Sequence, residues 1–166
     1  DIGCHEEIPE TADTLEGNAL IKARHIWERY GLYCFADDTG LEVEALDGAP
    51  GVYSARFAGE HATFEENVAL LLERLKGVPA PRRACFRTVI ALIDEYGTHF
   101  FEGAVNGEIT LERSGDHGFG YDPVFRPEGC QQTFAELSSE EKNAMSHRGR
   151  AVQRLARYLH ALPLDE

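Results

Sequence analysis

The stretch FADDTG, residues Phe35 to Gly40, joins an apolar run to two adjacent aspartates and a Thr-Gly pair. The run from Tyr33 to Ala36 predicts a short buried strand that ends at the aspartates. Successive side chains of a strand point to opposite faces, so Asp37 and Asp38 are not expected to share one role. Asp38 is interpreted either as a turn former or as a carboxylate at the strand end, where α/β folds bind ligands.

The segments around this stretch predict alternating helices and strands. Apolar residues at helical spacing indicate helices from Leu15 to Tyr30 and from Arg148 to Leu162, and a Thr63–Glu66 capping box opens another. The β-rich runs Ala84–Asp94 and His99–Val105 predict a hairpin. Glycine-rich loops are expected at residues 47–59 and 114–123. This order predicts one α/β (α+β) domain over residues 1–166, with a central mixed sheet flanked by helices.

Composition narrows the classes of function. A length of 166 residues suits one domain with a proper core. No run approaches the roughly 20 apolar residues that cross a bilayer. The formal net charge of −13 argues against nucleic acid or an anionic membrane as the main partner. A small anionic substrate remains compatible, because local cations or a metal ion can reverse the field at one site.

Cysteine and methionine usage bears on compartment and completeness. The four cysteines are scattered, at Cys4, Cys34, Cys85 and Cys130. Without CxxC or Cys/His spacing, free thiols in a reducing cytoplasm are expected rather than a zinc site or disulfides. Met145 is the only methionine, so Asp1 is not expected to be the start of the gene product. A strand before residue 1 would make the first helix a proper crossover.

Carboxylates and cations near the first helix suggest a phosphate or metal site. Glu10, in the loop before that helix, would join Asp38 in an oxygen-rich site, since Mg²⁺ prefers one or two carboxylates plus phosphate oxygens. Asn18 and Lys22 are four residues apart and share a helix face. The alternative interpretation of that pair is a solvated polar face.

The loop GDHGFGYDP, Gly115 to Pro123, has features of a base-binding segment. Its glycines let the backbone approach a ligand, and Phe119 and Tyr121 offer rings for stacking on a base. Asp122 can accept hydrogen bonds from a ring N–H. The alternative is an elaborate hairpin loop, and the pattern is not the GxGxxG of a dinucleotide site.

KNAMSHRGR, Lys142 to Arg150, is the densest basic patch in this acidic chain. Ser146 is the expected N-cap, so His147 and Arg148 stand at the N-terminus of the last helix. Backbone donors and the helix dipole there attract an anion or carbonyl oxygens. Cations at that end oppose the dipole unless something negative binds, which favours a binding role for the patch.

Four segments stand in order along the chain: EGNALIKA (16–23), FADDTGLEVEALDGAPGVYSARFAG (35–59), GFGYDPVF (118–125) and EEKNAMSHRGRA (140–151). Together they resemble the inosine/xanthosine triphosphate pyrophosphatase family at family-like spacing. The resemblance implies a central curved sheet and hydrolysis of the non-canonical purine nucleotides ITP, dITP and XTP to monophosphate and pyrophosphate. It also implies Mg²⁺ as cofactor and a cytoplasmic homodimer that cleans the nucleotide pool.

The resemblance implies roles for the matched residues. Asp38 is expected to accept a proton and bind metal, with Glu10 helping to hold the metal. Asp37 is expected to be a second metal contact or a structural hydrogen-bond acceptor. The remaining expected substrate contacts are Asn18, Lys22, Thr39, Phe119, Gly120, Tyr121, Asp122, Lys142, His147 and Arg148. Among these, His147 and Arg148 suit a 6-keto oxygen as donors, whereas a 6-amino group would leave buried groups unpaired.

Two departures from the family pattern limit these expectations. The family begins with a strand and a [ST]xNxxK phosphate loop, which this sequence lacks, and Pro9-Glu10-Thr11 stands where two acids often precede the Thr. The 166-residue chain alone is therefore expected to hydrolyse substrate poorly. The alternatives are a Maf-like nucleotide pyrophosphatase and a non-catalytic nucleotide-binding protein.

Overall fold

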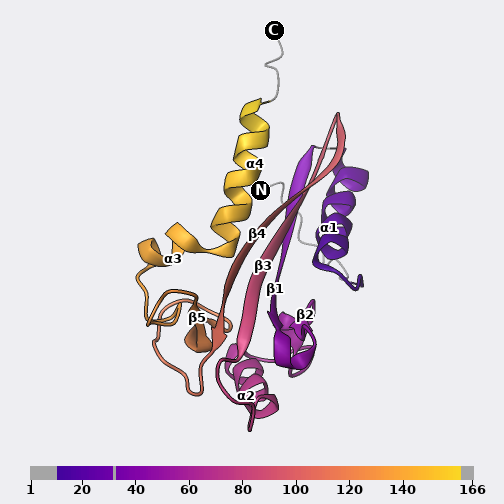
Figure 1. The fold of residues 1–166 in the computed structure, drawn as a ribbon. Coiled ribbons are helices and arrows are strands. Elements are labelled where there is room, and N and C mark those ends of the chain that lie inside the picture. The colour runs from indigo at the N-terminus through magenta and orange to yellow at the C-terminus, as the bar shows by residue number, and fades with distance from the viewer. Residues whose placement is uncertain (1–10, 32, 162–166) are drawn as a thin grey trace.

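The computed structural model describes residues 11–31 and 33–161, which form one long sheet with helices on both faces (Figure 1). The helices are α1 (Leu15–Tyr30), α2 (Phe64–Arg74), α3 (Ser139–Met145) and α4 (His147–Ala161). The strands are β1 (Cys34–Val43), β2 (Pro50–Gly51), β3 (Arg83–Asp94), β4 (Gly97–Ile109) and β5 (Phe125–Pro127). Short 3-10 helices lie at Glu44–Leu46, Ser54–Arg56 and Asp122–Val124.

The sheet has the strand order β2-β1-β3-β4-β5. Strands β1, β3 and β4 pair over their whole lengths, while β2 and β5 add only short pairings, at Leu41↔Gly51 and Gly107↔Pro127 among others. The predicted fold class is confirmed. Where a mixed sheet was expected, every strand pair among the described residues is antiparallel.

Two helices cover opposite faces of the upper sheet (Figure 1). Ala19 and Ala23 of α1 pack on Ala91 of β3, and Ala151 of α4 packs on its neighbour Ile90. Adjacent β3 residues face opposite helices because strand side chains alternate. The contact of α1 with β3 is centred on small side chains, with Ile93 and partly buried Leu20 beside them.

The main core lies at the lower end of the sheet, where β2 and β5 are added. Phe86 of β3 contacts Phe125 edge to face, with ring centroids 4.6 Å apart, and also lies near Phe134. Val68 and Leu71 of α2 close this core from below. Close packing of these side chains in one cluster gives this end of the sheet a rigid base.

Local signals predicted the helix ends well. Thr14 accepts a hydrogen bond from the Gly17 N–H and Gly31 adopts a left-handed conformation, so α1 has the predicted bounds. The Thr63–Glu66 capping box at α2 is confirmed. Helix α3 and strand β5 were not predicted. The strand predicted for Tyr33–Ala36 continues to Val43, because it pairs with distant β3 throughout.

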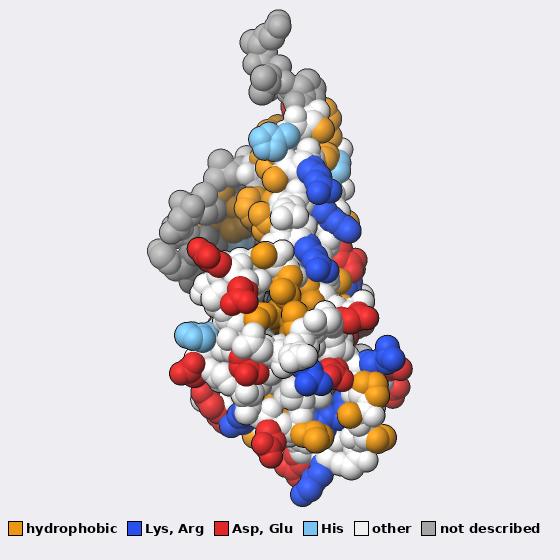
Figure 2. Space-filling model, turned by 60° about the vertical axis from the view of Figure 1, so that its left-hand side comes forward, with side chains coloured by type: hydrophobic (Ala, Val, Ile, Leu, Met, Phe, Trp, Pro, Cys, Tyr) orange, Lys and Arg blue, Asp and Glu red, His pale blue; other side chains and the backbone are white. Residues whose placement is uncertain are grey.

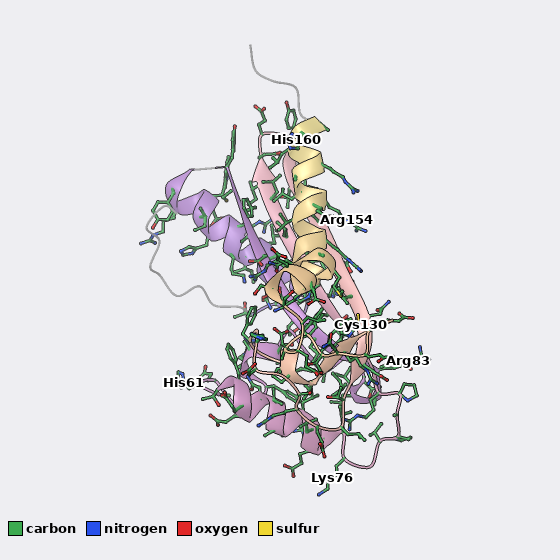
Figure 3. All side chains as sticks on the ribbon, turned by 90° about the vertical axis from the view of Figure 1, so that its left-hand side faces the viewer. His61, Lys76, Arg83, Cys130, Arg154 and His160 are labelled. Atoms are coloured by element: carbon green, nitrogen blue, oxygen red, sulfur yellow. The ribbon has the colours of Figure 1, made fainter. Side chains whose placement is uncertain are left out.

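The surface of α4 is basic on its outer side. Figure 2 shows basic side chains in a line along this helix, where Arg150, Arg154 and Arg157 are exposed. Figure 3 shows Arg154 and His160 projecting away from the sheet. No helix among residues 11–31 and 33–161 has the length and apolar character needed to cross a membrane.

Candidate functional site

Asp37 and Asp38 lie in the middle of β1, so the prediction that they end a strand is wrong. Thr39 and Gly40 continue the strand instead of turning, which also excludes the turn-former interpretation of Asp38. A Cβ on Gly40 would lie 2.5 Å from the carbonyl oxygen of Gly51 in neighbouring β2. The glycine that resembled a turn signal is therefore a position of close backbone approach.

Asp38 and Lys22 face each other between β1 and α1. Lys22 Nζ lies 3.4 Å from Asp38 Oδ1, and the two side chains are 24% and 11% exposed. An ionised carboxylate can accept hydrogen bonds or a proton, and an ammonium group can only donate. The structure thus brings a carboxylate and a cation, both predicted for the site, together in a partly shielded place.

Asn18 lies deeper than expected from its shared helix face with Lys22. It is fully buried, and its Oδ1 accepts a hydrogen bond of 2.9 Å from the Ala12 N–H. Its Nδ2 has no hydrogen-bond partner among the residues that the structure describes. Asn18 therefore fixes the segment that enters α1. Glu10, predicted to bind metal, precedes this segment and lies outside the described residues.

The opposite face of β1 carries Asp37 and Thr39. Asp37 Oδ2 accepts a hydrogen bond of 2.9 Å from Arg148 Nη2 at the start of α4. The Thr39 hydroxyl lies 2.8 Å from the Thr88 hydroxyl across the β1–β3 pair. The alternation expected for the two aspartates is therefore observed, and Asp37 meets the basic patch of α4 rather than Lys22.

The loop before β5 is held by its own polar side chains. Buried Asp122 accepts through Oδ2 from the Phe119 N–H at 3.0 Å and from Lys142 Nζ at 2.6 Å. A Cβ at Gly118 would lie 2.2 Å from that same oxygen, so this tight loop requires glycine there. The Lys142 ammonium also lies 4.5 Å from the centre of the Phe119 ring. That ring is 60% exposed, which leaves it available for stacking.

Two further residues of this loop have structural explanations. The Tyr121 hydroxyl is buried and donates a 2.6 Å hydrogen bond to the Ser54 carbonyl, and burial raises the pKa of Tyr121. The predicted stacking role would require an exposed ring, so Tyr121 is better explained as an anchor of the loop. Gly120 has a φ of 59°, a left-handed conformation that favours glycine.

His147 is the buried member of the basic patch. Its ring stacks on Phe86, with centroids 4.8 Å apart and planes within 11°. Burial, followed by the charges of Lys142 and Arg148, lowers the pKa of His147 to about 4. The imidazole is therefore neutral near pH 7. Its Nδ1 is buried without a hydrogen-bond partner among the described residues, which makes it a candidate contact for a ligand.

Two residues that shape the site were not predicted. The Ser54 hydroxyl accepts a hydrogen bond from the Leu41 N–H, and the Ser54 carbonyl accepts one from the Tyr121 hydroxyl. Ser54 lies within GVYSARFAG, and the match of this stretch to the family was the sequence feature that could have identified it. Gly103 of β4 gave no signal in the sequence. A Cβ there would lie 2.0 Å from the His147 carbonyl oxygen, so glycine allows α4 to start against the sheet.

The carboxylates at the site fit a magnesium ion that also binds substrate phosphate better than they fit a metal ion held by protein side chains alone. No group of three or more His, Cys, Asp or Glu side chains gathers as a metal site within residues 11–31 and 33–161. Asp38 provides one carboxylate beside a cation. Mg²⁺ usually binds through one or two carboxylates and takes its other ligands from phosphate and water. The chemistry of Asp38 therefore fits an ion that binds together with a phosphorylated substrate.

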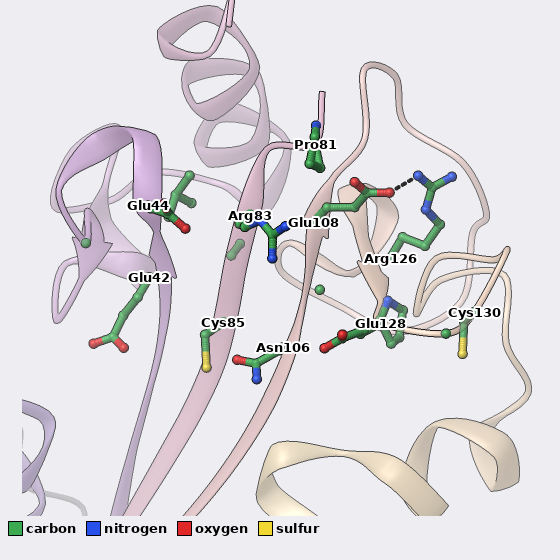
Figure 4. Close-up of a pocket in the computed structure, with 16 residues that line it drawn as sticks. Glu42, Glu44, Pro81, Arg83, Cys85, Asn106, Glu108, Arg126, Glu128 and Cys130 are labelled. Atoms are coloured by element: carbon green, nitrogen blue, oxygen red, sulfur yellow. Dashed lines mark hydrogen bonds and ion pairs between the residues drawn. The ribbon is translucent and has the colours of Figure 1, made fainter. Parts of the chain in front are cut away.

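A separate hollow of about 660 Å³ lies on the lower sheet face, away from the predicted site (Figure 4). Its lining includes Glu42, Cys85 and Asn106, which form one row across β1, β3 and β4. None of the predicted site residues within the described ranges lines this hollow. A smaller hollow of about 300 Å³ lies beside Phe119, next to the start of α2.

Comparisons with known proteins agree with this geometry. Residues 1–158 match the Ham1 family. A dITP/XTP pyrophosphatase of Porphyromonas gingivalis is 64% identical over 96% of this chain and 82% of its own length, and one of Flavobacterium johnsoniae is 53% identical over 97% and 83%. The solved HAM1 protein of Coxiella burnetii is similar with a TM-score of 0.90 and 44% identity, over 95% of this chain and 82% of that one.

Proposed function

Because this chain belongs to the Ham1 family, we propose that it hydrolyses ITP, dITP and XTP to the monophosphate and pyrophosphate. The observation that carries this proposal is the arrangement around β1. Asp38 meets Lys22 on one face, while Asp37 meets Arg148, one of the base-binding candidates, on the other. One nucleotide could place its phosphates and its purine at these two groups. Since its substrates belong to the free nucleotide pool, we place the enzyme in the cytoplasm.

The reaction requires water to attack phosphorus against concentrated negative charge. Asp38 is proposed to orient the water and to take its proton as the new P–O bond forms and pyrophosphate leaves. Lys22 lies where its charge would offset the charge that develops on the phosphate oxygens. Mg²⁺, held by Asp38 and Glu10 with Asp37 as a further predicted contact, would neutralise phosphate charge when bound.

Base selection is proposed to depend on the start of α4 and the loop before β5. Phe119 offers its exposed ring, and Lys142 is oriented over that ring by Asp122. Neutral His147 can donate from Nδ1 in one tautomer, and Arg148 always donates. A 6-keto oxygen accepts hydrogen bonds from such donors, whereas a 6-amino group would place its own N–H donors against them. This supports selection of hypoxanthine and xanthine over adenine.

Pyrophosphate release from ITP, dITP, XTP, GTP and ATP, with and without Mg²⁺, tests the proposal. We expect Mg²⁺-dependent release from the first three and kcat/KM on ATP lower by about 100-fold or more. GTP is included because its 6-oxo edge is the same, so its rejection must depend on the 2-amino group. Turnover of ATP at the rate of dITP would contradict the proposal. Binding without any release would indicate a non-catalytic nucleotide-binding protein.

We also propose that the protein forms a homodimer through the sheet face around the larger hollow, which no described helix covers. Across this face Glu44, Arg83, Glu108 and Arg126 alternate in charge, in the order seen in Figure 4. Glu108 and Arg126 already form an ion pair within the chain. A two-fold axis parallel to the strands would place Glu44 opposite Arg126 and Arg83 opposite Glu108 of the second copy. Opposite charges would then meet across the interface.

Sedimentation velocity tests this arrangement. Arg83→Glu should weaken the dimer, because two acidic side chains would then face each other, and adding Glu108→Arg should restore it. If both variants sediment as the unchanged protein does, this face is not the dimer interface. If the unchanged protein sediments as a monomer, the dimer proposal is wrong.

A further inference from the structure

Arg87 of β3 is the meeting point of glutamates from three other elements. Its Nη1 lies 2.7 Å from Glu16 of α1 and 3.8 Å from Glu102 of β4, and its Nη2 lies 3.3 Å from Glu42 of β1. Burial alone would lower the pKa of Arg87, but its hydrogen bonds to Glu16 and Glu42 outweigh burial and raise that pKa. Arg87 is thus a permanent cation that links α1 to three strands.

This cluster is adjacent to the proposed reaction centre. Arg87 lies opposite Gly40 in the β1–β3 register, and Asp38 lies two residues before Gly40 on the same face. Helix α1 therefore contacts the sheet through two ion pairs. Glu16 meets Arg87 in the first turn of the helix, and Lys22 meets Asp38 nearly two turns later.

The apolar contact between these two ion pairs is built mainly from small side chains. Ala19 and Ala23 are buried against Ala91 of β3 with Leu20 partly buried beside them, and buried Leu15 directly precedes Glu16. Methyl groups do not interlock as leucine or phenylalanine side chains do, so they limit sliding of the helix only weakly. A slip by one residue would move the helix about 1.5 Å along its axis. Such a slip is close to half of the 3.4 Å separation of Lys22 and Asp38, enough to break or misdirect their contact.

We propose that Arg87 is a positioning residue for the hydrolysis reaction. By holding Glu16, it sets where the first turn of α1 lies on the sheet and so keeps Lys22 at Asp38. The proposal rests on the function proposed above for those two residues. The glutamate side chains around Arg87 are 36% to 46% exposed, and exposed ion pairs contribute little to folding stability. The effect of Arg87 should therefore appear in catalysis more than in unfolding.

Kinetics of three variants test this role, with dITP and Mg²⁺. Arg87→Gln should lower kcat roughly 10-fold while KM changes less than about threefold, because small misplacements of reacting groups are costly. Arg87→Lys should restore part of kcat, since it keeps the charge but loses the two-armed contact. Arg24→Gln is the matched control. It removes the same charge from an exposed position on α1 and should leave kcat within about twofold of the unchanged protein.

Hydrogen exchange of the α1 amides supplies a readout that does not depend on activity. Arg87→Gln should speed exchange in α1, and Arg24→Gln should not. Adding Glu16→Gln to Arg87→Gln should cause no further loss of kcat, because both changes remove one contact. Unchanged exchange in Arg87→Gln, unchanged kcat, or additive losses in the double variant would each overturn the proposal. If the unchanged protein releases no pyrophosphate, the proposed function fails, and exchange alone decides whether Arg87 holds α1.

Discussion

The two faces of β1 differ at consecutive residues. On the α1 face, Asp38 is surrounded by ion pairs and small side chains, with Lys22 and the Arg87 cluster beside it. On the α4 face, Asp37 lies at the edge of an aromatic region in which His147 stacks on Phe86. The α1 face offers paired charges, and the α4 face offers a flat aromatic surface and the buried, unpaired Nδ1 of His147.

This difference suggests that the strand separates reaction from recognition. A phosphate group needs cations and a proton acceptor, which the α1 face supplies. A purine needs a flat apolar surface and a few oriented hydrogen-bonding groups, which the α4 face supplies. Changes on the α1 face should therefore alter kcat, and changes on the α4 face should alter KM and the choice of base.

Asp38→Asn should have the largest effect. The amide keeps the shape of the carboxylate but cannot take a proton from water, so kcat for dITP should fall about 1,000-fold, or about 4 kcal/mol in activation free energy. Steady-state pyrophosphate release measures the change. Unfolding by urea serves as the control and should show a folded protein. A loss of kcat below tenfold would remove Asp38 from its proposed role.

His147 should make stability depend on pH. Its pKa is about 4 in the folded protein and near 6.5 when unfolded, so between these values the unfolded chain binds more protons. The free energy of unfolding is therefore unaffected by the titration of His147 above pH 6.5. It falls as pH drops toward 4, by about 3 kcal/mol over the whole window. Urea unfolding at a series of pH values measures this slope.

The matched variant for this test is His147→Gln, which cannot titrate in that window. Its stability should fall less steeply with acid than that of the unchanged protein, and the difference between the two slopes isolates the histidine from other groups. Identical slopes would mean that His147 is more accessible to water than its packing on Phe86 indicates.

Gly103→Ala should disturb the recognition face alone. The new Cβ would lie 2.0 Å from the His147 carbonyl oxygen and 2.4 Å from the Ala151 nitrogen, so α4 must move away from β4. We expect about 2 kcal/mol of lost stability, a typical cost of overpacking. Discrimination between dITP and dATP, measured as the ratio of kcat/KM, should also decrease. If stability falls but the ratio of kcat/KM for dITP and dATP is unchanged, the position of α4 does not determine the choice of base.

Gly103 also illustrates what the sequence could not predict. The bounds of α1 and the capping box of α2 follow from neighbouring residues, so they were predicted correctly. The close approach at Gly103 depends on a helix that begins more than 40 residues later, and no local pattern records it. The same holds for Gly40, which resembled a turn signal because its contact with Gly51 in β2 is not visible locally.

The structure brings together residues predicted for the site, although the strand that carries two of them was predicted too short. Lys22, Asp38, Asp122, Lys142 and Arg148 were assigned to the site from their motifs together with the resemblance to the family, and the structure pairs each with another predicted residue. The neutral state of His147 and the anchoring role of Tyr121 were not predicted, because both depend on burial. Burial is set by packing between distant segments and is only weakly encoded by residue type.

Asp37→Asn should have the smallest effect and is the sharpest test of the comparison. Its partner Arg148 is 58% exposed, and Asp37 itself is 39% exposed, so losing the pair should cost below about 1 kcal/mol of stability. If Asp37 only orients Arg148, kcat should fall less than about threefold while KM rises modestly, because the arginine keeps its charge.

The same variant also tests the predicted metal contact. A metal ligand would show a raised Mg²⁺ requirement, measured by titrating Mg²⁺ at fixed dITP, whereas an Arg148 partner would not. Arg148→Gln is the matched change, since it breaks the same pair from the other side. If Asp37→Asn raises the Mg²⁺ requirement and Arg148→Gln does not, Asp37 acts with Asp38 despite facing away from it. The division of β1 into a reaction face and a recognition face would then be wrong at Asp37 and Asp38, the two residues on which it is based.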